Sequence, residues 1–372
     1  MMRTLAALAV AASLHAELPR FEEHTLATDL KGGYQVVLFD VNRDGKKDII
    51  ALASGMPDLY WFENPGWQRH VLATGFRRMI NVAACDGVDE MIVAHEFANT
   101  PKGSIGIVSV ITPGADRTQP WTVREIDRLT TSHRLRCADI DGSGRKVFVN
   151  APLAGAKAAA PDYRDHVPLV YYKPGEWKRM VIGEENEGVV HGIFIEPRPR
   201  GGDCILTASF VGLHRYCLDA GRWNREELAK GDPTPWPKSG SSDVAMGHLR
   251  KRPFLAAIES WHGKQVVIYT QANKHWQRQV IDAELSSGHT IVAADLDGDG
   301  RDEVIAGHRG PGTVGVNLYQ SDKAGARWTR TILDDKMAAS ACAGDDLDGD
   351  KHPDIVCIGS ATTNLKLYSR PR

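Results

Sequence analysis

Three stretches of the sequence carry oxygen side chains at the spacing that suits a hard cation. In SGHTIVAADLDGDGRDEVIAGHRG, Asp295, Asp297 and Asp299 occupy every second position, with Gly300 at the sixth place and Glu303 at the ninth. Oxygen ligands at this spacing suit Ca²⁺, and a glycine permits the sharp turn that the loop needs. An EF-hand would need flanking helices, whereas runs typical of strands flank this loop. We therefore expect a strand, a Ca²⁺-binding loop and a second strand.

The same acidic loop occurs twice more. One copy contains Asp40, Asn42, Asp44 and Asp48, and the other contains Asp346, Asp348, Asp350 and Asp354. In the second copy a lysine, Lys351, stands in the place of the glycine. Degenerate copies begin at Asp86 and Asp139, and we expect these to bind a cation weakly or not at all. A structural Ca²⁺ is therefore predicted in each of the three fuller loops.

Histidines recur at a fixed distance before the loops. His133 and His289 each lie six residues before the first acid of a loop, and His191 lies six residues before Pro197, which holds the corresponding place. If the stretches are copies of one unit, the three imidazoles begin equivalent strands and converge. Three imidazoles with an open fourth position are typical of catalytic Zn²⁺. The alternative is a metal-free acid–base cluster.

Packing alone does not explain these histidines, because Tyr34, Ser241 and Ser340 hold the same place in other copies. Further polar and aromatic residues are expected on the same face, where long connections carry function. As catalytic candidates we take His95, Glu259, His262, His308 and Tyr163. As substrate contacts we take Trp261, Lys238 and Arg164.

A second repeat indicates which elements position these residues. A tryptophan opens a short strand at Trp67, Trp121, Trp177, Trp223, Trp276 and Trp328. The copies are about 50 residues apart, a period typical of propellers. Another strand with an aromatic residue lies between each loop and the next tryptophan. Each unit is therefore a four-stranded antiparallel sheet that must stack on its neighbours to bury both faces.

The order of the copies predicts how the ring closes. The stretch FEEHTL, from Phe21, resembles a tryptophan strand and comes before the first acidic loop, whereas no such strand follows Tyr368. The last blade therefore lacks an outer strand that the N-terminus can supply. We predict an all-β, seven-bladed β-propeller with Ca²⁺-binding DxDxDG loops, closed by an N-terminal outer strand in the last blade.

Composition limits the cellular context. The chain has 372 residues, 42% of them hydrophobic, and a net charge of −2, which gives no argument for nucleic acid or an anionic membrane as partner. Arg3, an apolar run and Ala16 resemble a secretory signal peptide that is too short to span a bilayer. We expect a signal peptide at 1–16, a single propeller domain at 17–372, no membrane span, and a secreted or periplasmic protein of unknown oligomeric state.

Export would permit disulfides among the six cysteines. Cys204 and Cys217 flank one hairpin-like run, and Cys342 and Cys357 flank another. Either pair is expected to form a disulfide between neighbouring strands or to remain as two buried thiols. Cys85 and Cys137 have no such partner.

The acidic loops resemble the FG-GAP or VCBS family of propellers, which implies the fold and leaves the function open, since integrin heads, lectins and lyases share it. A narrower resemblance lies in the ordered stretches SHRLRCADIDG, VVHGIFIE, LTASFVGLHRY, KSGSSDVAMG, AAIESWHGKQVVIY and SGHTIVAADLDGDG. They are similar to the propeller domain of aldos-2-ulose dehydratase, which eliminates water from keto-sugars such as 1,5-anhydrofructose. That family's reference enzymes add cupin domains and an isomerase step, so we expect only the dehydratase step here.

The prediction is therefore an exported metal-dependent hydro-lyase that eliminates water from a keto-sugar, with a small carbohydrate as substrate, structural Ca²⁺ and catalytic Zn²⁺. One alternative is a non-catalytic, Ca²⁺-stabilised propeller that binds a glycan or a protein partner. The other is a polysaccharide lyase, which would need a basic groove. Arg77, Arg78 and Lys238 are too few to indicate such a groove.

Overall fold

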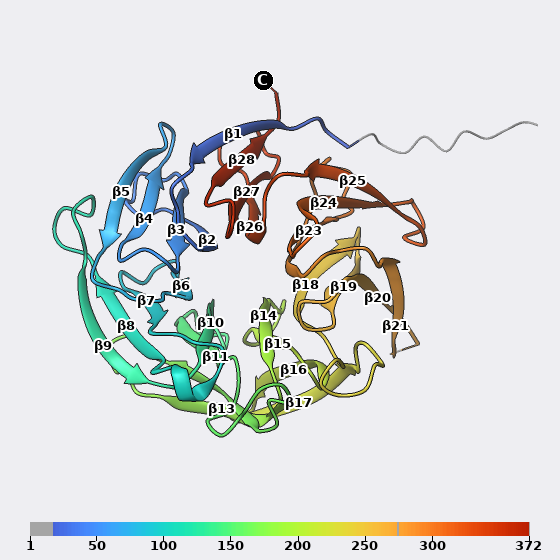
Figure 1. Ribbon diagram of the computed structural model, residues 1–372, viewed down its shortest axis with the longest axis horizontal. Helices are drawn as coiled ribbons and strands as arrows, with labels where there is room; N and C mark the ends of the chain where they lie inside the picture. Colours follow the sequence, from blue (N-terminus) through green and yellow to red (C-terminus); the bar gives the residue numbers. More distant parts are fainter. Residues whose placement is uncertain (1–17, 274, 372) are drawn as a thin grey trace, which may run out of the picture.

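A computed structural model describes residues 18–273 and 275–371, and these form seven four-stranded antiparallel sheets arranged around a central axis (Figure 1). The predicted all-β, seven-bladed propeller is confirmed. The predicted signal peptide, 1–16, lies outside the described residues, and the predicted domain limits stay a prediction. Within the described ranges, no helix is long and apolar enough to cross a membrane.

Each blade contributes one strand to the centre of the ring. The innermost strands are β2 (Gly33–Phe39), β6 (Asn81–Ala83), β10 (Ser132–Ala138), β14 (Val190–Glu196), β18 (Asp243–Leu249), β22 (Gly288–Ala294) and β26 (Ala339–Asp345). The second strands are β3 (Asp48–Ala53), β7 (Met91–His95), β11 (Val147–Pro152), β15 (Cys204–Ser209), β19 (Arg252–Glu259), β23 (Glu303–Arg309) and β27 (Asp354–Gly359).

The remaining strands lie farther from the axis. The third strands are β4 (Leu59–Glu63), β8 (Ile107–Thr112), β12 (His166–Tyr172), β16 (Gly212–Asp219), β20 (Gln265–Ala272), β24 (Val314–Ser321) and β28 (Leu365–Ser369). The outer strands are β5 (Gln68–Ala73), β9 (Thr122–Arg128), β13 (Met180–Glu187), β17 (Arg222–Ala229), β21 (His275–Asp282), β25 (Trp328–Asp334) and β1 (Glu22–Ala27). One short 3₁₀ turn, η1 (Pro101–Gly103), interrupts the second blade.

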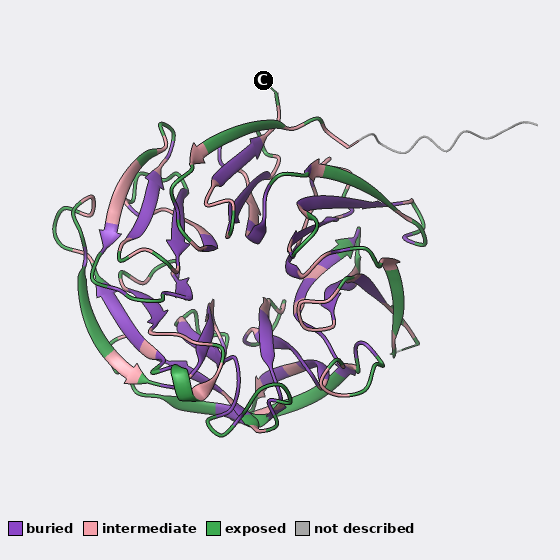
Figure 2. Cartoon of the chain, viewed as in Figure 1, coloured by how far each residue is buried: buried purple, intermediate pink, exposed green. Residues whose placement is uncertain are grey.

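Burial follows the distance from the rim. Second strands such as β3 and β27 are buried at every residue, whereas outer strands such as β9 are largely exposed (Figure 2). A strand covered by blades on both faces reads as a continuous apolar run, as DIIALA does in β3. The core therefore lies between the blades, and it extends around the ring.

A polar residue near the start of five innermost strands bonds to the next blade. Gln35 exchanges two hydrogen bonds with the backbone of Val82, Asn81 accepts from the amide of Leu135, and Arg134 donates to the carbonyl of His191. Asp243 and Thr290 accept from the amides of Ile291 and Cys342. These bonds fix the angle between neighbouring blades near the axis.

The N-terminal strand lies in the last blade. β1 pairs antiparallel with β28, from Glu22 opposite Ser369 to Ala27 opposite Leu365. Lys366 of β28 lies 2.8 Å from a carboxylate oxygen of Glu23 in β1 and 2.7 Å from one of Asp334 in β25. One buried ammonium group therefore links β1, its blade and the neighbouring blade.

Three disulfides are present among the described residues: Cys85–Cys137, Cys204–Cys217 and Cys342–Cys357. The second and third are the two hairpin pairs singled out from the sequence. Cys85 and Cys137, which have no partner within a hairpin, pair with each other across the boundary between the second and third blades, and the sequence analysis did not predict this pair. Hairpin symmetry cannot reveal a pair of that kind.

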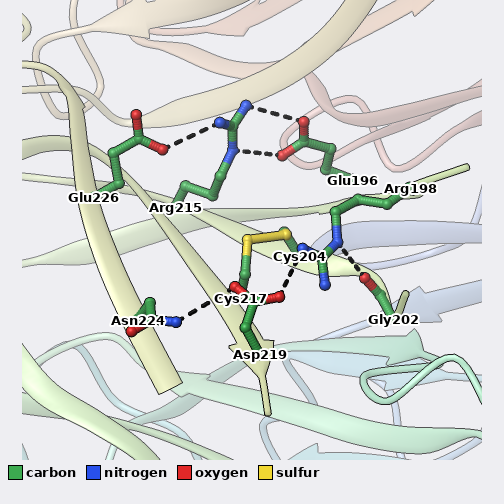
Figure 3. The surroundings of a disulfide bond; sticks show 9 residues. All are labelled: Glu196, Arg198, Gly202, Cys204, Arg215, Cys217, Asp219, Asn224 and Glu226. Atoms are coloured by element: carbon green, nitrogen blue, oxygen red, sulfur yellow. Dashed lines mark hydrogen bonds and ion pairs between the residues drawn. A yellow bond between two sulfur atoms is a disulfide. The ribbon is translucent and has the colours of Figure 1, made fainter. Parts of the chain in front are cut away.

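The fourth blade has lost its acidic loop and is held by other bonds. Cys204 of β15 and Cys217 of β16 form a disulfide, and Arg215 of β16 forms ion pairs with Glu196 of β14 and Glu226 of β17 (Figure 3). The guanidinium of Arg215 therefore spans the full width of the sheet. This blade keeps its shape without a cation loop.

Candidate functional site

The axial histidines occupy irregular positions in the innermost strands. His133, His191 and His289 lie at the points where β10, β14 and β22 shift register against their second strands. The same shift occurs at Tyr34 in β2 and at Ser340 in β26. A β-bulge re-aims a side chain locally. The repeated bulge therefore gives five blades a side chain with an equivalent placement at the axis.

The predicted histidine trio is only partly brought together as a metal site. The ring centroid of His191 lies 5.0 Å from that of His133 and 4.8 Å from that of His289. The group of histidine nitrogens that all lie within 4.8 Å of one another comes from His191, His262 and His289. His262, expected as a catalytic residue, therefore takes the place that was predicted for His133.

His262 reaches the group from the turn between β19 and β20. Its φ of 48° is in the left-handed region, and its amide donates a 3.3 Å hydrogen bond to the hydroxyl of Ser242. Its Nε2 then lies 3.2 Å from Nε2 of His191. Because the turn leaves the strand register, the repeat pattern could not reveal this approach. The only sign of this approach in the sequence was that Glu259, Trp261 and His262 lie close together where the chain leaves the fifth blade.

The hydrogen bonds of His191 and His289 leave a lone pair for a metal. Nδ1 of His191 lies 3.2 Å from the carbonyl oxygen of Ser242, and Nδ1 of His289 lies 2.5 Å from that of Ser340. A carbonyl can only accept, so Nδ1 of His289 carries the hydrogen and its Nε2 is unprotonated. Nδ1 of His191 also lies 3.2 Å from the hydroxyl of Ser242, and it donates to the carbonyl in the tautomer that leaves its Nε2 unprotonated. Nε2 of His289 is buried without a hydrogen-bond partner. This pattern is typical of histidines that bind a metal through Nε2.

The equivalent contacts also correct the alignment of the fifth blade. Ser242 accepts from His191 as Ser340 accepts from His289. Ser242, rather than Ser241, therefore holds the place in the fifth blade that Ser340 holds in the last blade.

Electrostatics keep the imidazoles neutral. Burial, with a smaller contribution from Arg134 or Arg309, lowers the pKa of His133, His191 and His289 well below its usual value. Burial, with Arg309 next, lowers the pKa of His262 to about 3. Neutral imidazole is the form that binds a metal or accepts a proton. The four rings are therefore neutral at neutral pH.

His133 lies beside the group and pairs with a tyrosine. Its Nε2 and the hydroxyl of Tyr34 share a hydrogen bond of 2.8 Å, and its ring lies 5.3 Å from that of Phe97. The ring of Tyr34 is 5.3 Å from that of His289. The sequence did not single out Tyr34 for function, although its position in the repeat matched that of the histidines.

An aromatic wall, defined as Tyr163, Phe210, Trp236 and Trp261, adjoins the histidines. The ring of Trp261 lies 5.1 Å from that of His262 and 5.4 Å from that of Tyr163. Its Nε1 is buried without an acceptor among the described residues. The guanidinium of Arg164 lies 4.4 Å from the ring of Trp236 and 3.3 Å from Glu187, while Lys238 is exposed.

Three predicted catalytic residues make their contacts elsewhere. His95 bonds to Ser109, and His308 bonds to the carbonyl of Thr313. The carboxylate of Glu259 accepts from Ser241, Tyr269 and Arg278. Burial raises the pKa of Glu259, although the hydrogen bonds from these donors act to lower it. None of the hydrogen bonds of these three side chains reaches the histidine group.

The three acidic loops share one internal architecture. The first carboxylate accepts the backbone amide at the sixth place: Asp40 from Gly45, Asp295 from Gly300 and Asp346 from Lys351. Lys351 has a φ of 73°, so the lysine adopts the left-handed conformation that glycine has in the other two loops. The turn is therefore preserved despite the missing glycine.

The loops differ in which of their carboxylate oxygens lie close together. Asp295, Asp297 and Asp299 form one group of neighbouring oxygens, and Asp346, Asp348 and Asp354 form another. The ninth acid also tethers the loop: Asp48 accepts from Val41, and Glu303 accepts from Leu296. Burial, with nearby aspartates, raises the pKa of Glu303 to about 8.

The other predicted ligands make local hydrogen bonds. Asp44 accepts from the amide of Lys46, and Asp350 accepts from the amide of His352. The side-chain amide of Asn42 donates to Glu63.

Comparisons with known proteins identify the relatives of this arrangement. The family model described as the beta-propeller domain of aldos-2-ulose dehydratase matches residues 106–272, and that of the FG-GAP-like repeat matches residues 295–357. Aldos-2-ulose dehydratase of Phanerodontia chrysosporium is 24% identical over 346 residues. The chain resembles the propeller of this dehydratase. The resemblance inferred from the sequence is thereby confirmed.

The extent of these matches limits what they show. The alignment with the dehydratase covers 79% of this chain, which spans 38% of the length of that relative. A solved WD40 beta propeller domain of Doa1 has a TM-score of 0.57 and 13% identity, and the match covers 94% of this chain and 98% of that one. The likeness to the Doa1 propeller shows the fold alone. The likeness to aldos-2-ulose dehydratase supports a dehydratase-like propeller.

Proposed function

We propose that the protein is an exported hydro-lyase that eliminates water from a keto-sugar and that it depends on a metal held by His191, His262 and His289. The observation that carries this proposal is the free, buried Nε2 of His289 beside the Nε2 atoms of the other two rings. Each pair of bonded ligands on a Zn²⁺ lies roughly 3.3 Å apart at Zn–N distances of about 2.0 Å. The 3.2 Å between His191 and His262 fits that spacing.

A bound Zn²⁺ supplies Lewis-acid polarisation of a carbonyl oxygen, which acidifies the neighbouring C–H group. The residues of this chain provide the rest. The carbonyl of Ser340 holds His289 in the required tautomer, and the carbonyl of Ser242 accepts from Nδ1 of His191 in the tautomer that binds the metal. A predicted metal ligand, His133, takes a different role in this proposal because its Nε2 is already bonded to Tyr34.

The pair of Tyr34 and His133 is proposed to move the proton. The pair accepts the proton from carbon, because the neutral imidazole of His133 takes the phenolic proton as the Tyr34 oxygen takes the substrate proton. The same pair then returns one proton to the departing β-hydroxyl, and water leaves as the carbon–carbon double bond forms. No net proton is gained or lost.

The substrate is proposed to lie against the aromatic wall. Sugar rings present C–H faces that pack on aromatic rings, and their hydroxyl groups satisfy buried polar atoms. The unpartnered Nε1 of Trp261 is a donor for one such hydroxyl. Tyr163, Arg164 and Lys238 stay candidates for further contacts, and Glu259, His95 and His308 for support of the strands that end near the site.

The turnover test uses purified protein and 1,5-anhydrofructose. We expect about one zinc per chain and an enone product that absorbs in the ultraviolet, with activity lost on chelation and restored by Zn²⁺. Calcium without zinc, and no product from any keto-sugar, would favour the alternative of a binding propeller whose aromatic wall holds a glycan. Product formation by protein shown to be free of zinc would contradict the metal-dependent mechanism.

We also propose that the three acidic loops bind structural Ca²⁺. Replacing Asp44 or Asp299 with Ala removes the fifth-position oxygen, so chelation should lower the melting temperature of the wild type by several degrees more than that of either variant. Asp141→Ala, in the degenerate loop of the third blade, serves as the control and should keep the wild-type response. Equal shifts in all four proteins would refute the calcium assignment.

A further inference from the structure

A cavity of about 320 Å³ lies on the propeller axis and is lined by all seven innermost strands. His289 lines it, so the cavity adjoins the histidine group. Its other ionisable lining residues are Arg134, Arg136 and Asp243. A space of this size holds on the order of ten waters at about 30 Å³ each, so it can accommodate an ion with part of its hydration shell.

The charges in the cavity do not balance. Arg134 and Arg136 contribute two positive charges, and Asp243 contributes one negative charge. Although burial lowers the pKa of Arg136 to about 10, this guanidinium is still protonated at neutral pH. The histidines nearby are neutral. One positive charge is therefore left uncompensated among the residues that line the cavity. Arg134 is buried, whereas Arg136 and Asp243 are partly exposed, so the cost of an unpaired charge falls mainly on Arg134.

The hydrogen-bond donors do not balance either. Each guanidinium has five N–H groups and no acceptor. Arg134 donates from Nε to the carbonyl of His191, and Arg136 donates only from Nη1, to Asn81 and Leu135. The Nη groups of Arg134, and Nε and Nη2 of Arg136, have no protein acceptor among the described residues. The carboxylate of Asp243 is committed to the amides of Val244 and Ile291.

We propose that this axial cavity binds a small inorganic anion, held by Arg134 and Arg136. A single monovalent anion would neutralise the excess charge and accept the unused N–H groups, as oriented guanidinium groups do elsewhere. The site is distinct from the proposed catalytic metal site and does not depend on it. Tyr34, whose ring centroid is 5.5 Å from the guanidinium of Arg134, is not among the residues that line the cavity.

The test measures thermal unfolding in sodium chloride against sodium gluconate at constant ionic strength, in zinc-free protein. We expect chloride to raise the melting temperature of the wild type by about 2 °C at roughly ten times its Kd. Arg136→Gln should remove this response. Arg145→Gln, which changes an exposed arginine on the loop after β10, should retain it.

Equal responses in the wild type and in Arg136→Gln would overturn the proposal. If that variant does not fold, crystals of the wild type soaked in bromide decide the question. An anomalous peak between Arg134 and Arg136 supports the site, and a cavity without such a peak refutes it.

Discussion

Replacing His262 with Ala is expected to reduce zinc affinity by more than about a hundredfold and to abolish dehydration. Changes to residues that merely orient a ligand cost roughly 10- to 100-fold, so loss of a ligand should cost more. His191→Ala and His289→Ala should have the same effect, because two imidazoles hold Zn²⁺ poorly. The double variant should be little worse than either single variant, since the site is already empty.

The informative comparison is with His133→Ala. Because its Nε2 is bonded to Tyr34, this variant should keep its zinc and lose turnover. Tyr34→Phe should behave in the same way. His214→Ala is the control for the loss of a buried histidine, since His214 lies in β16, away from the axial group. Zinc content, melting temperature and product absorbance are measured for each protein.

Two results would refute this assignment. Retention of zinc by His262→Ala, with loss of zinc from His133→Ala, would restore the ligand set inferred from the sequence. Loss of zinc from all four histidine variants, together with a large fall in melting temperature, would indicate collapse of the axial packing rather than loss of a ligand.

The sequence predicted the ring because its signals are repeated. Acidic loops and tryptophan strands recur in most blades, and each copy supports the assignment of the next. The same repetition placed His191 and His289 at equivalent heights. It could not predict which ring nitrogen is free, because that depends on the bulge at each histidine and on the carbonyl groups of Ser242 and Ser340 in the next blade.

The features that sequence reasoning missed break the repeat. His262 comes from a turn with a left-handed residue, so strand register gave no information about where its ring points. Cys85 and Cys137 join two blades, and no pattern within one hairpin could pair them. The acid at the ninth loop place was expected only as a cation ligand, but Asp48 accepts from two backbone amides, those of Val41 and Asn64. Such contacts require the three-dimensional arrangement.

Deletion of β1 is expected to have the largest effect on folding. A chain that starts after Leu30 would leave β28, with four buried residues and one partly buried, as an unpaired edge in the last blade. It would also remove Leu26 and Phe21, which pack on the cores on either side of that blade. Exposed, apolar edges pair with other chains. We therefore expect aggregation rather than a slightly less stable monomer.

The matched control is a chain that starts at residue 18, which retains β1. It should be soluble and should unfold in one cooperative transition, as measured by size-exclusion chromatography and chemical denaturation. A milder variant, Lys366→Met, removes the ammonium that contacts both Glu23 and Asp334 but keeps the strand pairs. Because Asp334 would then be a buried carboxylate that retains Tyr368 but loses its counter-charge, this variant should lower the free energy of unfolding by about 3 kcal/mol without aggregation. If the chain without β1 remained soluble and unfolded with the midpoint of the control, pairing of β1 with β28 would not be what closes the ring.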